Sequence, residues 1–309
     1  MPQTTKYLLD SGDPDEYREI AKLALDNGQE LWGSTTNPTL IAKKLSGRQV
    51  HSQGEAFSLQ KDIVLEIIDI VPGAVSAEVY ADQTTPAAEM ISQGREIASW
   101  HTRVVVKLPT TIEGFKARTE LRKLGIVTNN TLVFSQEQIF ATCLHEALIQ
   151  KLFGPIDSTW PTFISPFVGR LDDIGLDGMS LVSEGMRLKS LAQFLALDGN
   201  VPWMLEASVR RPEHIKRGID AGAELITAPA KIYREWFALS DHDKQTLEET
   251  PKNELKPLNA WSPPEEIQDP SGIETFIEYL DSNKLDIRHE LTNKGIVGFV
   301  EDWKAIITS

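Results

Sequence analysis

The 309-residue sequence has a single cysteine, Cys143, so it can form no intrachain disulfide, and this scarcity indicates a reducing compartment. Long apolar runs are also absent. No stretch of about 18 apolar residues occurs, and the first residues lack a basic segment followed by an apolar one. We therefore expect a cytoplasmic protein without a membrane partner.

Positive charge is scarce as well. The 31 Lys and Arg residues face 45 Asp and Glu residues, which gives a formal net charge of −14 and argues against nucleic acid as a partner. Much of the acidity follows Ser240, where fifteen Asp and Glu stand against seven Lys and Arg. The part before Ser240 is only mildly acidic, so its arginines can still hold an anionic substrate.

Motifs for metals and nucleotides are missing too. None of the six histidines has HxH or HExxH spacing, and neither GxGxxG nor GxxxxGK[ST] occurs. We therefore expect neither a metal ion nor another cofactor.

What the sequence does contain is an alternation of short β-like runs with stretches of helical periodicity. The β-like runs cover residues 6–12, 30–37, 74–81, 103–109, 126–134, 162–169, 201–208 and 223–229. The helical stretches include residues 14–28, 87–101, 111–125 and 211–223. Eight alternations predict an α/β fold, a closed (β/α)8 TIM barrel over residues 1–240, rather than an open sheet. Residues 241–309 are predicted to be an acidic C-terminal segment whose additional helices, at 273–282 and 292–308, pack on the barrel.

Polar residues lie near the ends of several predicted strands. Residues two apart on a strand face the same way. The resulting set is Asp10, Thr35 with Asn37, Glu78 with Ser76, Lys107, Asn129 with Thr131, and Ser165 with Phe167. Because a barrel builds its active site at the carboxyl ends of its strands, we expect these side chains to converge.

Lys107 ends the apolar run VVVKLP. Apolar surroundings disfavour the charged form of a lysine, and a neutral amine can attack a carbonyl to form a Schiff base. The alternative is a strand-end lysine that extends into solvent. Asp10 and Glu78 favour the catalytic interpretation, because an imine mechanism needs carboxylates that move protons and Glu78 has no evident partner. Asp10 could instead cap a helix, but Asp13, directly before Pro14, is the better cap.

Eight ordered blocks, spread over nearly the whole chain, resemble transaldolases: LLDSGD, TTNPTLIAK, VSAEV, VVVKLP, NNTLVFS, SPFVGRLDD, EASVRRPEH and LTNKGIVGFVEDW. The resemblance implies a Schiff-base transferase of the class I type whose lysine lies on the fourth barrel strand, as Lys107 does. It implies transfer of a dihydroxyacetone unit from sedoheptulose 7-phosphate or fructose 6-phosphate to glyceraldehyde 3-phosphate or erythrose 4-phosphate, in the pentose phosphate pathway. Phosphorylated sugars are then the partners, and we also expect a homo-oligomer.

The resemblance also implies a role for each converging residue. Lys107 would form the imine with the ketose, and Asp10 would be the acid/base on the hydroxyl whose deprotonation breaks the carbon–carbon bond. Glu78 with Thr131 would position a water that shuttles protons. The implied substrate-binding residues are Thr35, Phe167 and the three that hold the hydroxyls of the three-carbon unit, Asn37, Asn129 and Ser165.

The phosphate end follows from the residues and from the resemblance together. Arg170, Arg210 and Ser208 supply two guanidiniums and a hydroxyl, a suitable set of donors for a phosphate. The alternative for each arginine is an ordinary solvated side chain. Aldolases of the family have a tyrosine where Phe167 stands and a glutamine where Glu78 stands, so both residues indicate transfer rather than simple cleavage.

Other positions depart from the family pattern. Arg211 and Glu206 leave substrate preference open, so a fructose-6-phosphate aldolase-like enzyme and a lyase specific for sulfonated sugars stay as alternatives. A third alternative is a catalytically silent barrel used for binding, against which the set of Lys107, Asp10 and Glu78 argues.

Three segments are also unlike the family: residues 46–57, residues 151–160 and the acidic tail. We interpret them as lid, interface or stability features.

Overall fold

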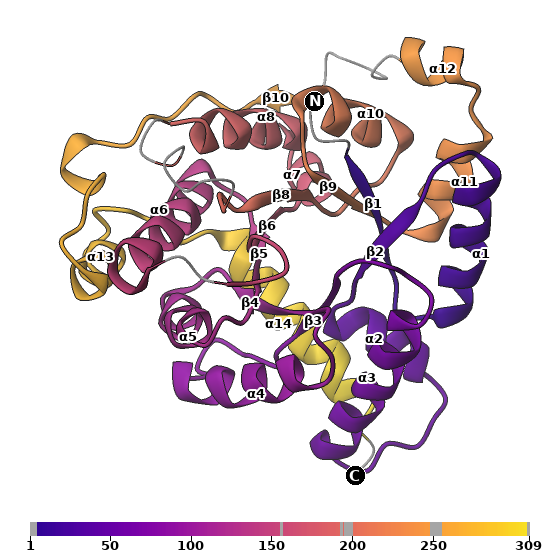
Figure 1. The fold of residues 1–309 in the computed structure, drawn as a ribbon, viewed down its shortest axis with the longest axis horizontal. Helices are drawn as coiled ribbons and strands as arrows, with labels where there is room; N and C mark the ends of the chain where they lie inside the picture. Colours follow the sequence, from indigo (N-terminus) through magenta and orange to yellow (C-terminus); the bar gives the residue numbers. More distant parts are fainter. Residues whose placement is uncertain (1–4, 155–156, 192–193, 195–199, 248–254, 308–309) are drawn as a thin grey trace.

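The computed structural model describes residues 5–154, 157–191, 194, 200–247 and 255–307. Eight parallel strands close into a barrel in the order β1-β2-β3-β4-β5-β6-β8-β9, and β9 pairs back with β1 (Figure 1). The strands are β1 (Lys6–Asp10), β2 (Leu31–Thr35), β3 (Val75–Glu78), β4 (Val104–Pro109), β5 (Thr128–Val133), β6 (Phe163–Pro166), β8 (Trp203–Glu206) and β9 (Leu225–Ala228). Each lies within one of the eight predicted runs, so the predicted barrel is confirmed.

Helices surround the barrel (Figure 1). They are α1 (Pro14–Asp26), α2 (Pro38–Leu45), α3 (Gln53–Ile68), α4 (Ala87–Ser99), α5 (Ile112–Lys123), α6 (Gln136–Phe153), α7 (Val168–Asp172), α8 (Gly178–Lys189), α10 (Pro212–Ala221) and α11 (Ala230–Ala238). Local sequence sets their starts. The Asp13 side chain accepts a hydrogen bond from the Asp15 amide at 3.1 Å, which confirms Asp13 as the cap of α1. Within the described part of the chain, no helix has the length and apolarity needed to cross a membrane.

Aromatic side chains fill the amino-terminal end of the barrel. The rings of Phe163 and Trp203 stack with centroids 5.9 Å apart, and Trp32 packs against Trp203 at 6.3 Å and edge-on against Trp160 at 5.5 Å. This end is therefore closed by apolar packing, and the polar side chains that face inward lie toward the carboxyl ends of the strands.

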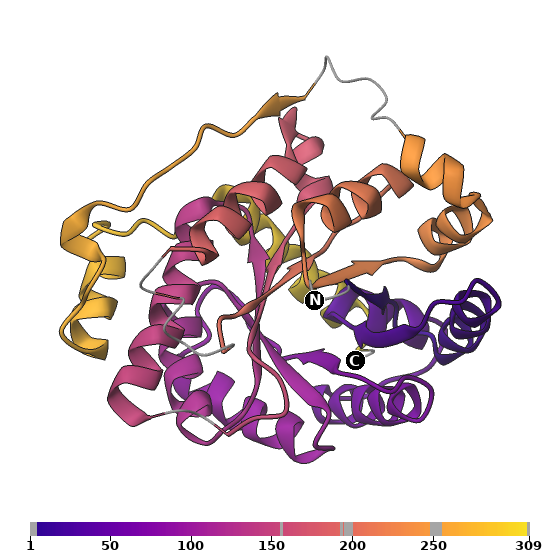
Figure 2. The ribbon, with the colours of Figure 1, turned by 45° about the horizontal axis from the view of Figure 1, so that its top comes forward.

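A small sheet outside the barrel was not predicted from the sequence. It pairs β7 (Leu176–Asp177) with β10 (Lys256–Pro257) in parallel. Figure 2 shows the segment that carries β10 running along the outside of the molecule. Only helices are predicted within residues 241–309, and residues 248–254 of that segment lie outside the described part. A two-residue strand leaves no periodic signal, because its pairing depends on a distant partner.

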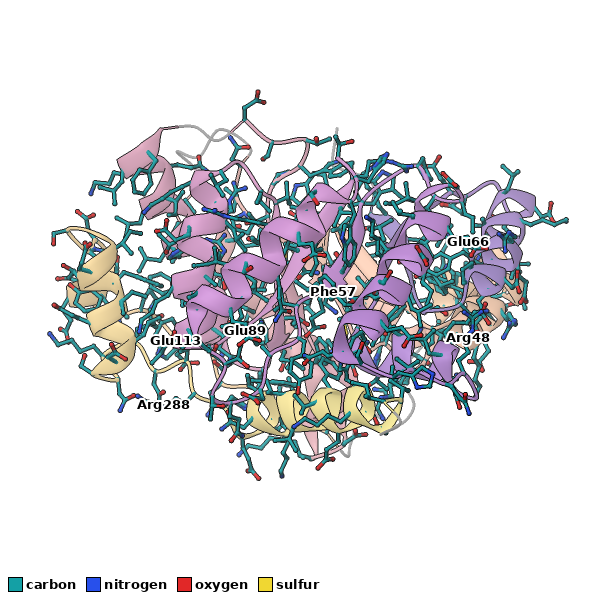
Figure 3. All side chains as sticks on the ribbon, turned by 90° about the horizontal axis from the view of Figure 1, so that it is seen from below. Arg48, Phe57, Glu66, Glu89, Glu113 and Arg288 are labelled. Atoms are coloured by element: carbon teal, nitrogen blue, oxygen red, sulfur yellow. The ribbon has the colours of Figure 1, made fainter. Side chains whose placement is uncertain are left out.

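The acidic segment contributes α12 (Asp241–Thr246), the short 3-10 helix η1 (Glu265–Ile267), α13 (Ile273–Asp281) and α14 (Glu290–Ala305). Phe276 of α13 packs against Phe115 of α5 and His145 of α6, with centroids 5.4 and 5.1 Å apart. The helix α14 contacts α2 and β5, and Thr292 donates a hydrogen bond to the Leu132 carbonyl at 2.9 Å. These contacts confirm additional C-terminal helices on the barrel. Figure 3 shows α14 along the lower side, with the labelled Arg288 near its start.

The unusual segment 46–57 forms the connection between α2 and α3 and the first turn of α3. Val50, within it, forms a parallel bridge with Ile307 and so ties this connection to the C-terminal part of the chain. In the second unusual segment, 151–160, residues 155 and 156 lie outside the described part. The lid, interface or stability interpretation of both segments stays a hypothesis.

Candidate active site

A cavity of about 210 Å³ lies at the carboxyl ends of the barrel strands. Its lining residues are Asp10, Thr35, Asn37, Thr39, Leu40, Lys107, Thr131, Ser165, Phe167, Arg170, Ala207, Ser208, Arg210, Thr227 and Phe299. Ten of the twelve predicted site residues are among them. The other two, Glu78 and Asn129, are buried directly behind lining residues and bonded to them or paired with them.

Lys107 is held at the floor of this cavity. All six residues of β4 are buried, and Lys107 itself is only 3% exposed, so the solvent-extended alternative is wrong. Its Nζ donates a hydrogen bond to the Thr36 carbonyl at 2.8 Å and lies 3.1 Å from Glu78 Oε2. The two residues are register partners on adjacent strands, β3 and β4. The barrel therefore places an amine and a carboxyl group in direct contact, away from bulk solvent.

Glu78 and Thr131 flank the amine with groups that can hold or move protons. Burial raises the pKa of the Glu78 carboxyl, and the Lys107 ammonium opposes that rise. The Thr131 hydroxyl is fully buried and lines the cavity, and within the described residues Oγ1 has no hydrogen-bond partner. A buried hydroxyl in this state is free to bond a water or a substrate hydroxyl.

Asp10 ends β1 on the opposite side of the cavity. Burial raises the pKa of its carboxyl, while Lys107, the Thr35 hydroxyl and Arg170 act in the other direction. The Thr35 Oγ1 hydroxyl donates to Asp10 Oδ1 at 2.7 Å. Because Asp13 caps the helix, Asp10 is left to face the cavity.

The predicted amide and hydroxyl ligands differ in how much of their hydrogen-bonding capacity is still available. Ser165 donates to Asn129 Oδ1 at 2.8 Å, and Asn129 Nδ2 donates to Ser76 Oγ at 3.3 Å. Asn37 is the cap of α2, because its Oδ1 accepts from the Leu40 amide at 3.0 Å. Its Nδ2 group is thus the part of Asn37 that can donate to a ligand.

The cationic end of the cavity comes from α7 and the loop after β8. The Arg170 guanidinium carbon lies 5.5 Å from the Phe167 ring centre and 5.7 Å from that of Phe299. Ser208 adopts a left-handed conformation with φ of 59°. Gly169 permits the close approach of α7, since a Cβ there would lie 2.3 Å from the Ser208 carbonyl oxygen and 2.5 Å from Arg210 Cγ. This packing places Arg170, Ser208 and Arg210 along one wall.

Sequence reasoning missed several lining residues. Thr227 lies two residues after Leu225 on β9, so the same parity rule that selected Thr35 would have found it. Phe299 comes from α14, and its position over Arg170 depends on the docking of a helix far along the chain. Nothing in its local sequence distinguishes it from an ordinary apolar helix residue.

The assembled groups define the chemistry that is possible here. A buried amine serves as a nucleophile, two carboxyl groups can transfer protons, and two guanidiniums with a hydroxyl can bind an anion. Across the described ranges, no three His, Cys, Asp or Glu side chains gather in a metal-binding arrangement.

A family match and three similar proteins indicate the same family for this chain. The family described as Transaldolase/Fructose-6-phosphate aldolase matches residues 7–309. A "Probable transaldolase" of Lactiplantibacillus plantarum is 33% identical over 300 residues, 97% of each chain, and "Probable transaldolase 2" of Listeria monocytogenes is 33% identical over 97% of this chain and 96% of its own. A "Probable transaldolase" of Prosthecochloris aestuarii is 39% identical over 233 residues, 74% of this chain and 89% of its own.

Proposed function

Because this chain belongs to the transaldolase/fructose-6-phosphate aldolase family, we propose that it is a transaldolase that works through a Schiff base on Lys107. The donor is a ketose phosphate, sedoheptulose 7-phosphate or fructose 6-phosphate, and the acceptor is an aldose phosphate, glyceraldehyde 3-phosphate or erythrose 4-phosphate. The observation that carries this proposal is the buried contact of Lys107 Nζ with Glu78 Oε2 at 3.1 Å beneath the cavity.

The imine forms between the Lys107 amine and the ketose carbonyl. The ammonium first passes a proton to Glu78, a transfer that the contact between the two groups permits. The neutral amine adds to the carbonyl carbon, and the carbinolamine loses water as its hydroxyl is protonated. Glu78 and Thr131 hold the water that carries these protons, which is consistent with the buried, unpartnered Thr131 hydroxyl.

The carbon–carbon bond is broken from the other side of the cavity. Asp10 accepts the proton of the C4 hydroxyl, and the electrons of the C3–C4 bond pass into the imine to form an enamine. The aldose leaves as an aldehyde, and the three-carbon unit stays on Lys107. The acceptor aldehyde then enters, the enamine attacks it, and Asp10 returns the proton to the new hydroxyl.

Substrate recognition follows from the remaining groups. Arg170, Arg210 and Ser208 line the same cavity as Lys107 and supply the donors that suit the phosphate of the sugar. The dihydroxyacetone unit is assigned to Asn37, Asn129 and Ser165, together with Thr35. This assignment is supported by the position of Asn129 as the register partner of Lys107 on β5.

Two residues decide between transfer and simple cleavage. Phe167 has no proton to give to the enamine, and Glu78 is the carboxylate typical of transaldolases rather than aldolases. The second candidate, a fructose-6-phosphate aldolase-like enzyme or a lyase for sulfonated sugars, stays open because guanidiniums bind a sulfonate as well as a phosphate.

Borohydride trapping tests the central assignment. With fructose 6-phosphate, sodium borohydride should inactivate the protein and add a three-carbon mass to the peptide that contains Lys107. An adduct on the exposed Lys231, or none at all, would contradict the proposal. EDTA should leave activity unchanged, because the imine rather than a metal ion withdraws electrons from the breaking bond.

A coupled assay separates the two candidate activities. Fructose 6-phosphate alone should release little free dihydroxyacetone, and adding erythrose 4-phosphate should give rapid turnover. The predicted cytoplasmic location and homo-oligomeric state belong to the same proposal, and fractionation and light scattering test them.

A further inference from the structure

Three side chains on adjacent strands form a hydrogen-bonded chain that ends at Asp10. Thr35 Oγ1 lies 2.7 Å from Asp10 Oδ1 and also 2.7 Å from Thr227 Oγ1. Asp10 and Thr35 are register partners on β1 and β2, and Thr227 lies across β1 on β9. Both threonines are almost fully buried, with 2% and 1% exposure, and both line the cavity.

The number of hydrogens fixes the direction of this chain. A threonine hydroxyl carries one hydrogen. Thr35 uses its hydrogen to donate to Asp10, so its oxygen can only accept from Thr227. Thr227 is therefore the donor at the start of the chain, and both O–H dipoles point toward the carboxylate. Hydrogen bonds aligned in this way strengthen one another.

The surroundings of Asp10 make such donors important. Burial disfavours its charged form. The titratable groups that act on it or respond to it come from five elements or their ends: Lys107, Arg170, Glu78, Tyr17 and Tyr233. On the outer side, Asp10 adjoins a groove lined by the charged groups Asp13, Glu16, Lys43, Lys44, Lys231 and Arg234. Lys44 is paired with Asp13 and Arg234 with Glu19, so part of this positive charge is already neutralised.

We propose that Thr227 is a positioning residue for the acid–base step: through Thr35 it holds the Asp10 side chain in place and stabilises its carboxylate form. The inference rests on the proposed role of Asp10, which must be ionised to accept the proton of the C4 hydroxyl. Thr227 takes no proton in this step. It supplies a second hydrogen bond in series, which makes Thr35 a stronger donor to Asp10 Oδ1.

Removing the Thr227 hydroxyl tests the inference directly. In protein labelled with ¹³C at aspartate carboxyl carbons, the Asp10 signal is assigned with Asp10→Asn and followed by NMR across pH. Thr227→Val should move the Asp10 titration midpoint up by roughly half a pH unit, because the remaining donor loses cooperative support. Thr35→Val, which removes the direct donor, should move it further, and Thr227→Ser should restore the wild-type midpoint.

Two comparisons keep the result interpretable. Thr142→Val removes another fully buried threonine hydroxyl, bonded to the Gln138 carbonyl and outside the cavity, and should leave the Asp10 midpoint in place. If Thr227→Val does not fold, Thr227→Ala must show the same upward shift. An unchanged midpoint in the hydroxyl-free variants, or an equal shift in Thr142→Val, overturns the inference.

Kinetic measurements then test whether the hydrogen-bonded chain from Thr227 through Thr35 to Asp10 affects the reaction. In Thr227→Val the acidic limb of kcat/KM for dihydroxyacetone transfer should shift upward with the NMR midpoint, and Thr227→Ser should reverse it. If borohydride traps no imine on the wild-type protein, the proposed function is refuted. The NMR titration still shows whether Thr227 stabilises the Asp10 carboxylate. If the wild type is active but the acidic limb of kcat/KM in Thr227→Val stays where it is in the wild type, the catalytic part of the inference is refuted.

Discussion

Arg210, on the cationic wall of the cavity, is held by Asp173: its Nη1 and Nη2 donate to the two Asp173 carboxylate oxygens at 3.0 and 2.8 Å. Both side chains are about half exposed, at 48% and 54%. The carboxylate thus occupies the two-pronged face of the guanidinium that a phosphate would use. Binding of a phosphorylated sugar has to displace or share this partner.

Replacing Asp173 should therefore strengthen phosphate binding. An exposed pair of this kind contributes ~0.2–1 kcal/mol, so Asp173→Asn should lower KM for phosphorylated substrates by roughly 1.4- to fivefold. Unphosphorylated dihydroxyacetone donors should respond little. Asp15→Asn, which breaks the comparable exposed pair with Arg18, is the matched control. A higher KM in Asp173→Asn would mean that Asp173 orients Arg210 for the substrate instead of competing with it.

Phe167 should control the fate of the enamine. It is 8% exposed, lines the cavity, and lies between the Arg170 guanidinium and the Phe134 ring. Phe167→Tyr adds a hydroxyl that can protonate the enamine, so release of free dihydroxyacetone from fructose 6-phosphate should rise while transfer to erythrose 4-phosphate falls. Phe167→Leu adds no proton donor and should not raise the release. An equal increase in both variants would show that space, not proton donation, matters.

Glu206 should make stability depend on pH. It is fully buried between β8 and α10, and within the described residues neither carboxyl oxygen has a hydrogen-bond partner. Gly218 makes room for it, since a Cβ there would lie 1.8 Å from Oε2. Burial raises the pKa of this carboxyl well above its ordinary value of 4.5.

The sign of the effect follows from proton binding. Between the unfolded-state pKa and the higher folded-state pKa, the folded protein binds more protons at Glu206, so the free energy of unfolding falls as pH rises. Glu206→Gln removes this loss and should raise Tm at pH 8 relative to wild type by about 2–4 °C, the shift that ~1 kcal/mol gives in a large domain. At pH 4 the difference should vanish. The exposed Glu235→Gln on α11 is the control, and a pH-independent difference would contradict the assignment.

A buried ion-pair network should carry much of the stability of the α5–α6 face. Glu146 accepts from Arg118 at 2.7 Å and from Arg122 at 2.8 Å, and all three side chains are at most 2% exposed. Burial lowers the pKa of Arg118 to about 10, so the guanidinium stays charged at neutral pH. Glu146→Gln leaves two buried cations without their anion and should cost ~3–5 kcal/mol in urea unfolding. Glu120→Gln, which removes the carboxylate of an exposed pair with Lys123, should lower the free energy of unfolding in urea by less than about 1 kcal/mol. Equal costs would refute the network.

The sequence by itself determined the barrel and the floor of the candidate site. Strand alternation has a period of two, so Lys107, Glu78 and Asp10 could be placed facing inward at strand ends before any tertiary contact was known. Helix starts were equally local, as the Asp13 cap illustrates. Such features follow from neighbours in the chain, and the barrel then brings the strand ends together.

Only the tertiary structure decided how these groups are connected. Three contacts in the site join segments that are tens to hundreds of residues apart in the chain. They are the pairs Arg210–Asp173, Thr35–Thr227 and Arg170–Phe299. The same holds for β10, which pairs with the distant β7, and for the buried Glu206, for which Gly218 of α10 leaves room. These contacts depend on how helices and loops pack against the barrel, and packing between distant segments leaves no periodic trace in the local sequence.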